Sequence, residues 1–234
     1  MAANTATRRR LLLVATSGIA ALALSACSEH EKEGDEVTAN EDLMREHGII
    51  RRTLFVYREA ARRARTDAAS LPLPNLRDAA QLFREFAEDY HEHALEEQHI
   101  FPLVRKLKSP LALLPEVLEK QHQRGREITD YILRVAAGAS LGTSESERFA
   151  ATLEGLIAMY GPHAAREDTE LFPAWKTALG AKAYDEMGER FEELEHKMFG
   201  HDGFADARAR IVKIEAAFGL TDLATVTAPP PPAA

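Results

Sequence analysis

The sequence predicts an all-α protein: an antiparallel up-down four-helix bundle with extra helices at its C-terminal end. Between residues 40 and 220, apolar residues recur at the three- and four-residue spacing of helices, without the alternation of strands. Short breaks containing proline or glycine separate four long segments. Short connections make neighbouring helices antiparallel, and 234 residues suffice for one domain with a sizeable core.

The first expected helix spans residues 40–66. Thr38 and Glu41 have the spacing of a capping box at its start. Because residues three and four apart share a helix face, one apolar stripe follows. Its members are Leu43, His47, Ile50, Leu54, Tyr57 and Ala61.

The second expected helix spans residues 75–101 and follows a turn at Pro72 and Pro74. The 3.6-residue period gives it a stripe that combines aromatic residues with a histidine and an acid. The stripe consists of Phe83, Phe86, Tyr90, His93, Glu97 and Ile100.

The third expected helix starts near Pro110 and ends near residue 137, before a loop at residues 138–143. Its inward face carries Leu114, Leu118, His122, Gly125, Ile128 and Ile132.

The fourth expected helix starts near Ser144, which has capping-box spacing to Glu147. Pro162 removes a backbone donor and is expected to kink the helix. Its stripe consists of Phe149, Leu153, Leu156, Tyr160, His163, Glu167 and Leu171.

Two further helices are expected at residues 181–198 and 203–218, with a break at residues 200–203. The helical domain therefore covers residues 40–220. A proline-rich tail at residues 221–234 is expected to be disordered.

The N-terminal 26 residues read as a signal peptide. Three arginines, at residues 8–10, precede a short apolar run that ends at Ala26. Residues 24–27 read LSAC, which resembles a bacterial lipobox, so Cys27 is the expected lipidation site. The arginines suit either a twin-arginine signal or the general export route. Residues 27–39 are expected to form a lipidated tether, and the protein an exported lipoprotein of the bacterial cell envelope.

Charge and cysteine content exclude several classes of function. Removing residues 1–26 removes three arginines and no acidic residue, so the net charge changes from -8 to -11. That charge argues against a nucleic-acid partner. Cys27 is the only cysteine, which excludes disulfides, iron–sulfur clusters and a CxxCH haem attachment in the domain.

Each of the four stripes carries a histidine, which a helix bundle does not need for packing. His93 and His163 are each followed four residues later by an acid, Glu97 and Glu167, on the same helix face. Imidazole and carboxylate groups suit iron, whereas buried acids without a cation are costly. The pattern predicts two metal ions held by inward-pointing ligands.

A weak internal repeat leaves the register of the second helix open. EEQHIFP at residues 96–102 parallels EDTELFP at residues 167–173. Aligning these stretches puts the first ligand at Glu92, which His91 and His93 flank. Periodicity favours His93, and His91 is the alternative. On the fourth helix the carboxylate ligand is Glu167 or Asp168.

Four stretches together resemble the hemerythrin-like, HHE cation-binding family. They read DLMREHG (residues 42–48), YHEHALEEQHIFP (90–102), QHQ (121–123) and HAAREDTELFP (163–173). The resemblance implies an up-down four-helix bundle with a non-haem di-iron centre, although some members bind other metals. It implies the following ligands: His47, His93, Glu97, His122, His163, and Glu167 or Asp168.

One departure from the family bears on function. Oxygen-carrying members have two histidines one turn apart on the third helix, but Leu118 and Arg126 stand four residues either side of His122. Reversible oxygen carriage is therefore in doubt. The expected small ligands are dioxygen, peroxide or nitric oxide, and the expected cofactor is iron, with manganese or zinc possible. A sensor or iron-binding module without turnover and a metal-free structural bundle remain alternatives, and enzymatic activity is left open.

Overall fold

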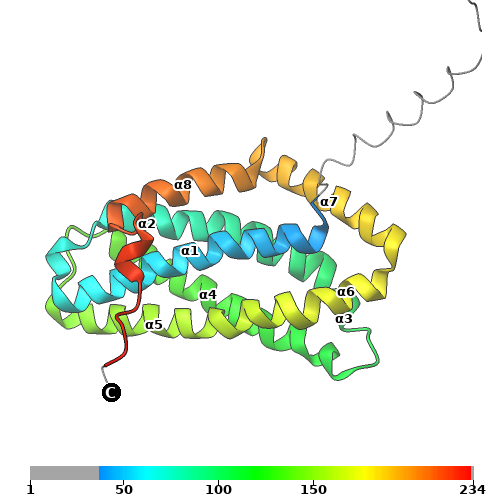
Figure 1. Cartoon of the computed structure of the whole chain (residues 1–234), viewed down its shortest axis with the longest axis horizontal. Helices are drawn as coiled ribbons and strands as arrows, with labels where there is room; N and C mark the ends of the chain where they lie inside the picture. Colours follow the sequence, from blue (N-terminus) through cyan, green and yellow to red (C-terminus); the bar gives the residue numbers. More distant parts are fainter. Residues whose placement is uncertain (1–36, 233–234) are drawn as a thin grey trace, which may run out of the picture. The chain divides into compact units, whose positions relative to one another are not determined.

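The computed structural model describes residues 37–232, and these residues contain helices and no strand (Figure 1). The expected signal peptide, the lipidation site Cys27 and most of the expected tether lie outside the described residues. Among the residues described, no helix is both long enough and apolar enough to cross a membrane.

The first helix, α1 (Ala39–Thr66), begins at the capping box that the sequence predicts. The Glu41 amide donates to Thr38 Oγ1 at 3.4 Å, and the Thr38 amide donates to Glu41 Oε2 at 2.9 Å. The predicted stripe is buried along the whole helix, and it includes His47.

The second long segment departs from the expected single α-helix. It runs from α2 (Leu73–Leu82) through a π-helical segment, η2 (Phe83–Ile100), into α3 (Phe101–Val104). A π-helix bonds residue i to i+5, so each turn takes about one more residue than an α-turn. Of the predicted stripe, Phe83, Phe86, Tyr90 and Ile100 are buried, whereas His93 and Glu97 are not.

The third segment starts with a 3₁₀ turn, η3 (Pro110–Leu113), and continues as α4 (Leu114–Ala136). The fourth starts with α5 (Thr143–Arg166), whose N-cap is Gly142, so the capping box expected at Ser144 is not formed. Helix α5 continues through Pro162. The helical geometry changes only at a π-turn, η4 (Glu167–Leu171), before α6 (Phe172–Leu179).

The long helices lie lengthwise beside one another (Figure 1). Helix α1 packs along α5, and α2 packs against α4. Between α4 and α5 the approach is close at Gly125, where the ring of Tyr160 fills the space that a Cβ atom would occupy. The side chains of these four segments form one continuous apolar core.

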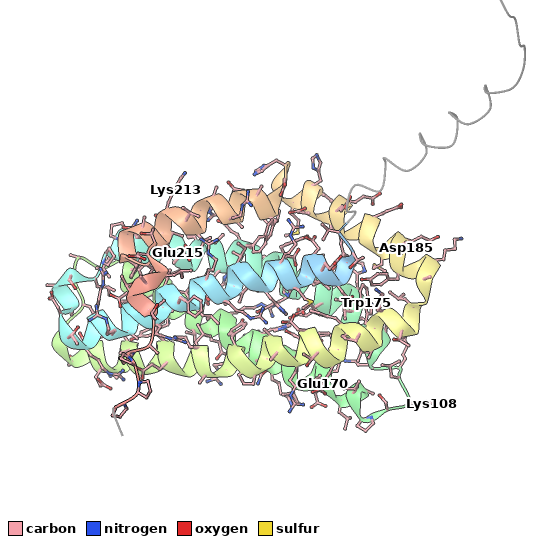
Figure 2. The ribbon with its side chains drawn as sticks, viewed as in Figure 1. Lys108, Glu170, Trp175, Asp185, Lys213 and Glu215 are labelled. Carbon is pink, nitrogen blue, oxygen red and sulfur yellow. The ribbon has the colours of Figure 1, made fainter. Side chains whose placement is uncertain are left out.

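The two C-terminal helices, α7 (Ala181–Phe199) and α8 (Gly203–Phe218), agree with the predicted ranges and pack on the core. Trp175 of α6 is fully buried and stacks on Phe191 of α7 with ring centroids 5.7 Å apart (Figure 2). Glu215 of α8 accepts from Arg52 Nε of α1 at 2.8 Å (Figure 2). A short 3₁₀ turn, η5 (Leu223–Val226), lies within the expected tail.

Gly125→Ala is expected to destabilise the fold by about 1–3 kcal/mol, because a Cβ at this position meets the Tyr160 hydroxyl at 2.5 Å. Gly155→Ala is the matched control: it lies exposed in α5 with no atom within 4 Å of its Cβ position. That change is expected to stabilise by about 0.5–1 kcal/mol. Denaturant unfolding measures both, and equal effects would contradict the close approach at Gly125.

Candidate metal centre

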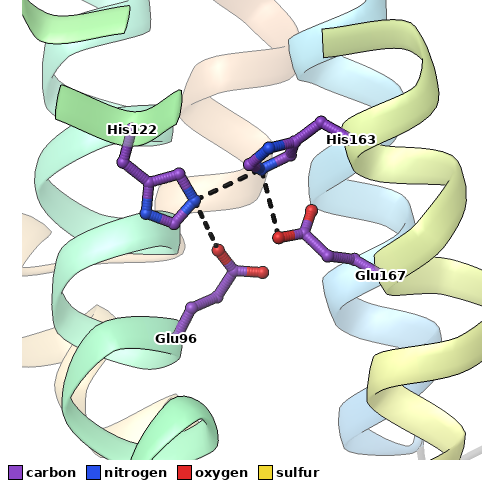
Figure 3. A group of neighbouring side chains, drawn as sticks. All are labelled: Glu96, His122, His163 and Glu167. Carbon is purple, nitrogen blue, oxygen red and sulfur yellow. Dashed lines mark hydrogen bonds and ion pairs between the residues drawn. The ribbon is translucent and has the colours of Figure 1, made fainter. Parts of the chain in front are cut away.

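Six buried side chains meet at the centre of the long helices, and each is at most 4% exposed. The two π-helical segments supply three of them, and α1, α4 and α5 supply one histidine each. Figure 3 shows four of the six. The six are His47, His91, Glu96, His122, His163 and Glu167.

The first half of this centre is formed by His47 and His91, whose Nε2 atoms lie 3.0 Å apart. Glu96 Oε1 lies 3.5 Å from His91 Nε2, and Glu167 Oε2 lies 3.5 Å from His47 Nε2. The donor atoms of His47, His91 and Glu96 lie within 4.8 Å of one another, and Glu167 joins them through its contact with His47.

The second half repeats this arrangement with His122 and His163, whose Nε2 atoms lie 3.2 Å apart. Glu96 Oε2 lies 3.3 Å from His122 Nε2, and Glu167 Oε1 lies 3.1 Å from His163 Nε2 (Figure 3). Each carboxylate thus turns one oxygen toward each histidine pair.

The outer nitrogens of the first histidine pair donate to carboxylates. His47 Nδ1 lies 2.6 Å from Asp168 Oδ1, and His91 Nδ1 lies 2.5 Å from Glu46 Oε2. Carboxylate oxygens accept hydrogen bonds, so both Nδ1 atoms carry the proton. The Nε2 atoms of both rings consequently face the centre.

The second pair is held in the same way. His122 Nδ1 lies 2.9 Å from Glu97 Oε1, and His163 Nδ1 lies 2.8 Å from the side-chain oxygen of Gln121. All four rings therefore turn their Nε2 atoms toward the centre.

This donor set fits two cations. The carboxylate oxygens of Glu96 and Glu167 are buried and have no hydrogen-bond partner, and unpaired buried carboxylates are costly. Two ligands of one metal ion, with bonds of about 2.1 Å at roughly right or tetrahedral angles, lie about 3.0–3.4 Å apart. The distances between donor atoms in each half are close to that range.

The electrostatics of the centre also favour positive charge. Burial opposes protonation of His91, but Glu96 and Glu46 outweigh it and raise its pKa well above the ordinary value. Burial likewise opposes charge on Glu167, yet His163 and His47 lower its pKa. Protons or metal ions can supply this charge, so the two compete for the same nitrogens.

The structure brings His47, His122, His163 and Glu167 together as the sequence predicts. The inward position expected for His93 is wrong: its side chain is 57% exposed and pairs with Glu97.

The two remaining predicted ligands lie outside the converging set. Glu97 and Asp168 accept from the outer nitrogens of His122 and His47, so they orient the rings. Arg126 donates to Glu97 at 2.8 Å, and Arg51 donates to Asp168.

The π-helical segment explains the error on the second helix. His91 and Glu96 are five residues apart and share a face only where the helix bonds i to i+5. His163 and Glu167, in α-geometry up to the π-turn, are four apart. The internal repeat carried the signal: it paired Glu96 with Glu167 and put the missing histidine one residue after His91.

Comparison with known proteins gives one family. A sequence model described as "Hemerythrin HHE cation binding domain" matches residues 38–175, more than half of the chain. The chain is also similar to "Uncharacterized protein Rv1995" of Mycobacterium tuberculosis and "Uncharacterized protein Mb2018" of Mycobacterium bovis. Each is 40% identical over 233 residues, which cover 94% of this chain and 90% of the relative. No solved structure matches.

Asp42 lies one turn before Glu46, and the pH dependence of its contribution to stability tests how strongly Glu46 and burial act on it. Burial and Glu46 raise the pKa of Asp42 to about 7. The stability that protonated Asp42 contributes is therefore complete below its ordinary pKa and is lost as the pH rises through about 7. Asp42→Asn is expected to raise the thermal midpoint of the metal-free protein at about pH 8 and to change it little below about pH 4.

The exposed Asp89→Asn is the control for removing one negative charge. An equal effect of Asp42→Asn at both pH values would contradict the prediction.

Proposed function

The chain belongs to the hemerythrin HHE cation-binding family, and we propose that it is a non-haem di-iron protein of the bacterial cell envelope. In this proposal the described helices carry the metal centre, and lipid on Cys27 holds the domain at the membrane surface. The lipobox-like LSAC sequence and the acidic, polar residues after it support the anchoring.

The proposal rests on one observation: the two histidine pairs face the same two acids, Glu96 and Glu167. His47 and His91 would hold one ion, and His122 and His163 the other, with Glu96 and Glu167 bridging both. Imidazole with carboxylate suits iron, and manganese or zinc are the other candidates. The chain offers no cysteine ligand in the domain.

The same four segments support the bundle that the family implies. We propose that α1, the α2–η2 segment, α4 and α5 form an antiparallel up-down four-helix bundle, with α7 and α8 packed outside it. Each of the four contributes at least one donor or ring-orienting side chain to the centre, as inward-facing ligands of bundle proteins do.

Two aromatic rings cover the centre. Phe172 stacks on His47 with centroids 5.6 Å apart, and Phe101 stacks on His122 at 5.5 Å. Both phenylalanines belong to the repeated Phe-Pro motif, so the repeat seals both halves. Every donor side chain is at most 4% exposed, so the ligands that we propose are small: dioxygen, peroxide or nitric oxide.

When bound, a pair of iron ions supplies one- and two-electron redox chemistry to such ligands. The chain's own residues position the imidazoles, exclude bulk water and hold negative charge at the centre. Leu118 and Arg126 stand one turn either side of His122, where oxygen carriers have a second histidine, and Arg126 binds Glu97. One nitrogen ligand fewer favours redox handling or sensing over reversible oxygen carriage.

The first experiment is metal analysis of the full chain purified in air, combined with Mössbauer spectroscopy after loading with ⁵⁷Fe. Two coupled high-spin ferric ions per chain are expected. A stably folded protein that contains no metal, and takes up none from ferrous iron, would overturn the proposal.

His91→Ala is expected to lower the iron content sharply, because it removes a donor at the centre. His93→Ala is expected to leave the iron content unchanged, because that side chain lies at the surface. These neighbouring histidines are matched controls for each other, and metal analysis with circular dichroism measures binding and fold. Loss of iron in His93→Ala alone would reverse the assignment.

Glu96→Gln and Glu97→Gln compare an acid that faces the centre with an acid that orients a histidine ring. Glu96→Gln removes the charge and replaces one inward oxygen by an amide nitrogen, so the iron content is expected to fall sharply. Glu97→Gln keeps an acceptor for His122 Nδ1, and a reduction in affinity of roughly 10–100-fold is expected. Equal, complete loss in both variants would contradict the distinction between bridging and orienting acids.

A further inference from the structure

The two halves of the centre are related residue by residue. On α1, Glu46 precedes His47 and holds the ring of His91, which belongs to η2. On α4, Gln121 precedes His122 and holds the ring of His163, which belongs to α5. In each half, the residue before the histidine on α1 or α4 therefore orients a second histidine on another segment.

The halves differ at this position by one charge. Glu46 is a carboxylate, buried at 1% exposure, and His91 Nδ1 lies 2.5 Å from it. Gln121 offers a neutral amide oxygen at 2.8 Å to His163. A carboxylate that accepts from the outer nitrogen raises the basicity of the imidazole, and a neutral amide does so much less.

A second difference acts in the same direction. Asp168 is shared between His47 and Arg51. Its counterpart Glu97 is shared among three donors, since Arg126 and His93 bind it at 2.8 Å in addition to His122. Asp168 is therefore shared between fewer hydrogen-bond donors than Glu97.

We propose that the two metal positions are unequal: the His47–His91 position binds its ion more tightly and fills first, and the pair Glu46 and Gln121 sets this order. The inference rests on the proposed two-metal function. It makes Glu46 and Gln121 positioning residues that determine affinity, because neither points an atom into the centre.

Zinc titration of the metal-free full chain tests the order without any catalytic readout. Zinc is redox-inert and takes the same nitrogen and oxygen ligands. Competition with a chromophoric chelator at constant neutral pH is expected to show two sequential steps, with affinities separated by roughly 10–100-fold.

Two substitutions that change one charge show which zinc-binding step belongs to which half of the centre. Glu46→Gln keeps the hydrogen bond to His91 but removes the charge, and it is expected to weaken the tighter step by roughly 10–100-fold. Gln121→Glu adds a charge behind His163 and is expected to tighten the weaker step. If Glu46→Gln fails to fold, the Gln121→Glu result alone decides.

Gln123→Glu is the matched control. It adds the same charge on the same helix, two residues further on and at the surface. It is expected to leave both steps unchanged, so a tightening in both glutamate variants would mean a general charge effect and would overturn the inference.

The outcomes separate this inference from the proposed function. Two bound zinc ions with a single affinity, insensitive to Gln121→Glu, would overturn the unequal positions while two-metal binding stands. No bound zinc and no bound iron in the unaltered chain would overturn the proposed function itself. Unequal steps that respond to the two exchanges as described would establish the order.

Discussion

Two buried carboxylates facing four imidazole nitrogens are the constraint on which the described structure depends. Glu96 and Glu167 are fully buried, and their oxygens lack hydrogen-bond donors. Such charges persist in an apolar core only beside a compensating positive charge. The rings of four histidines, their outer acceptors and the two arginines that bind Glu97 and Asp168 are all arranged around that requirement.

The chain meets this requirement by changing its helical geometry where these two acids lie. Glu96 is within the π-helical segment η2, and Glu167 opens the π-turn η4. A π-turn adds a residue per turn and often marks a functional site. Each acid is followed by a second acid that turns outward to a histidine on another helix, so one short motif supplies both a donor and an orienting group.

The parts of the site in regular α-helix were predictable from the sequence, and the part in π-helix was not. The 3.6-residue period placed His47, His122 and His163 inward because α1, α4 and α5 keep that period. It failed at His93 because i-to-i+5 bonding rotates His91 inward, and neither residue type nor hydrophobicity signals such bonding. The helix boundaries followed Thr38, the prolines and the glycines, whereas Ser144 lost its capping role to the preceding Gly142.

Each central histidine is oriented by a hydrogen bond to a side chain of another segment, and this has a consequence for evolutionary change. Glu46 orients His91, Gln121 orients His163, Glu97 orients His122, and Asp168 orients His47. Each pair joins two different segments, so replacing one member by a side chain without a hydrogen-bonding group leaves its partner on another segment unpaired. Apart from exchanges between Glu and Gln, which keep the hydrogen bond, substitutions in descendants of this chain should therefore arise as linked changes: 46 with 91, 97 with 122, 121 with 163 and 47 with 168.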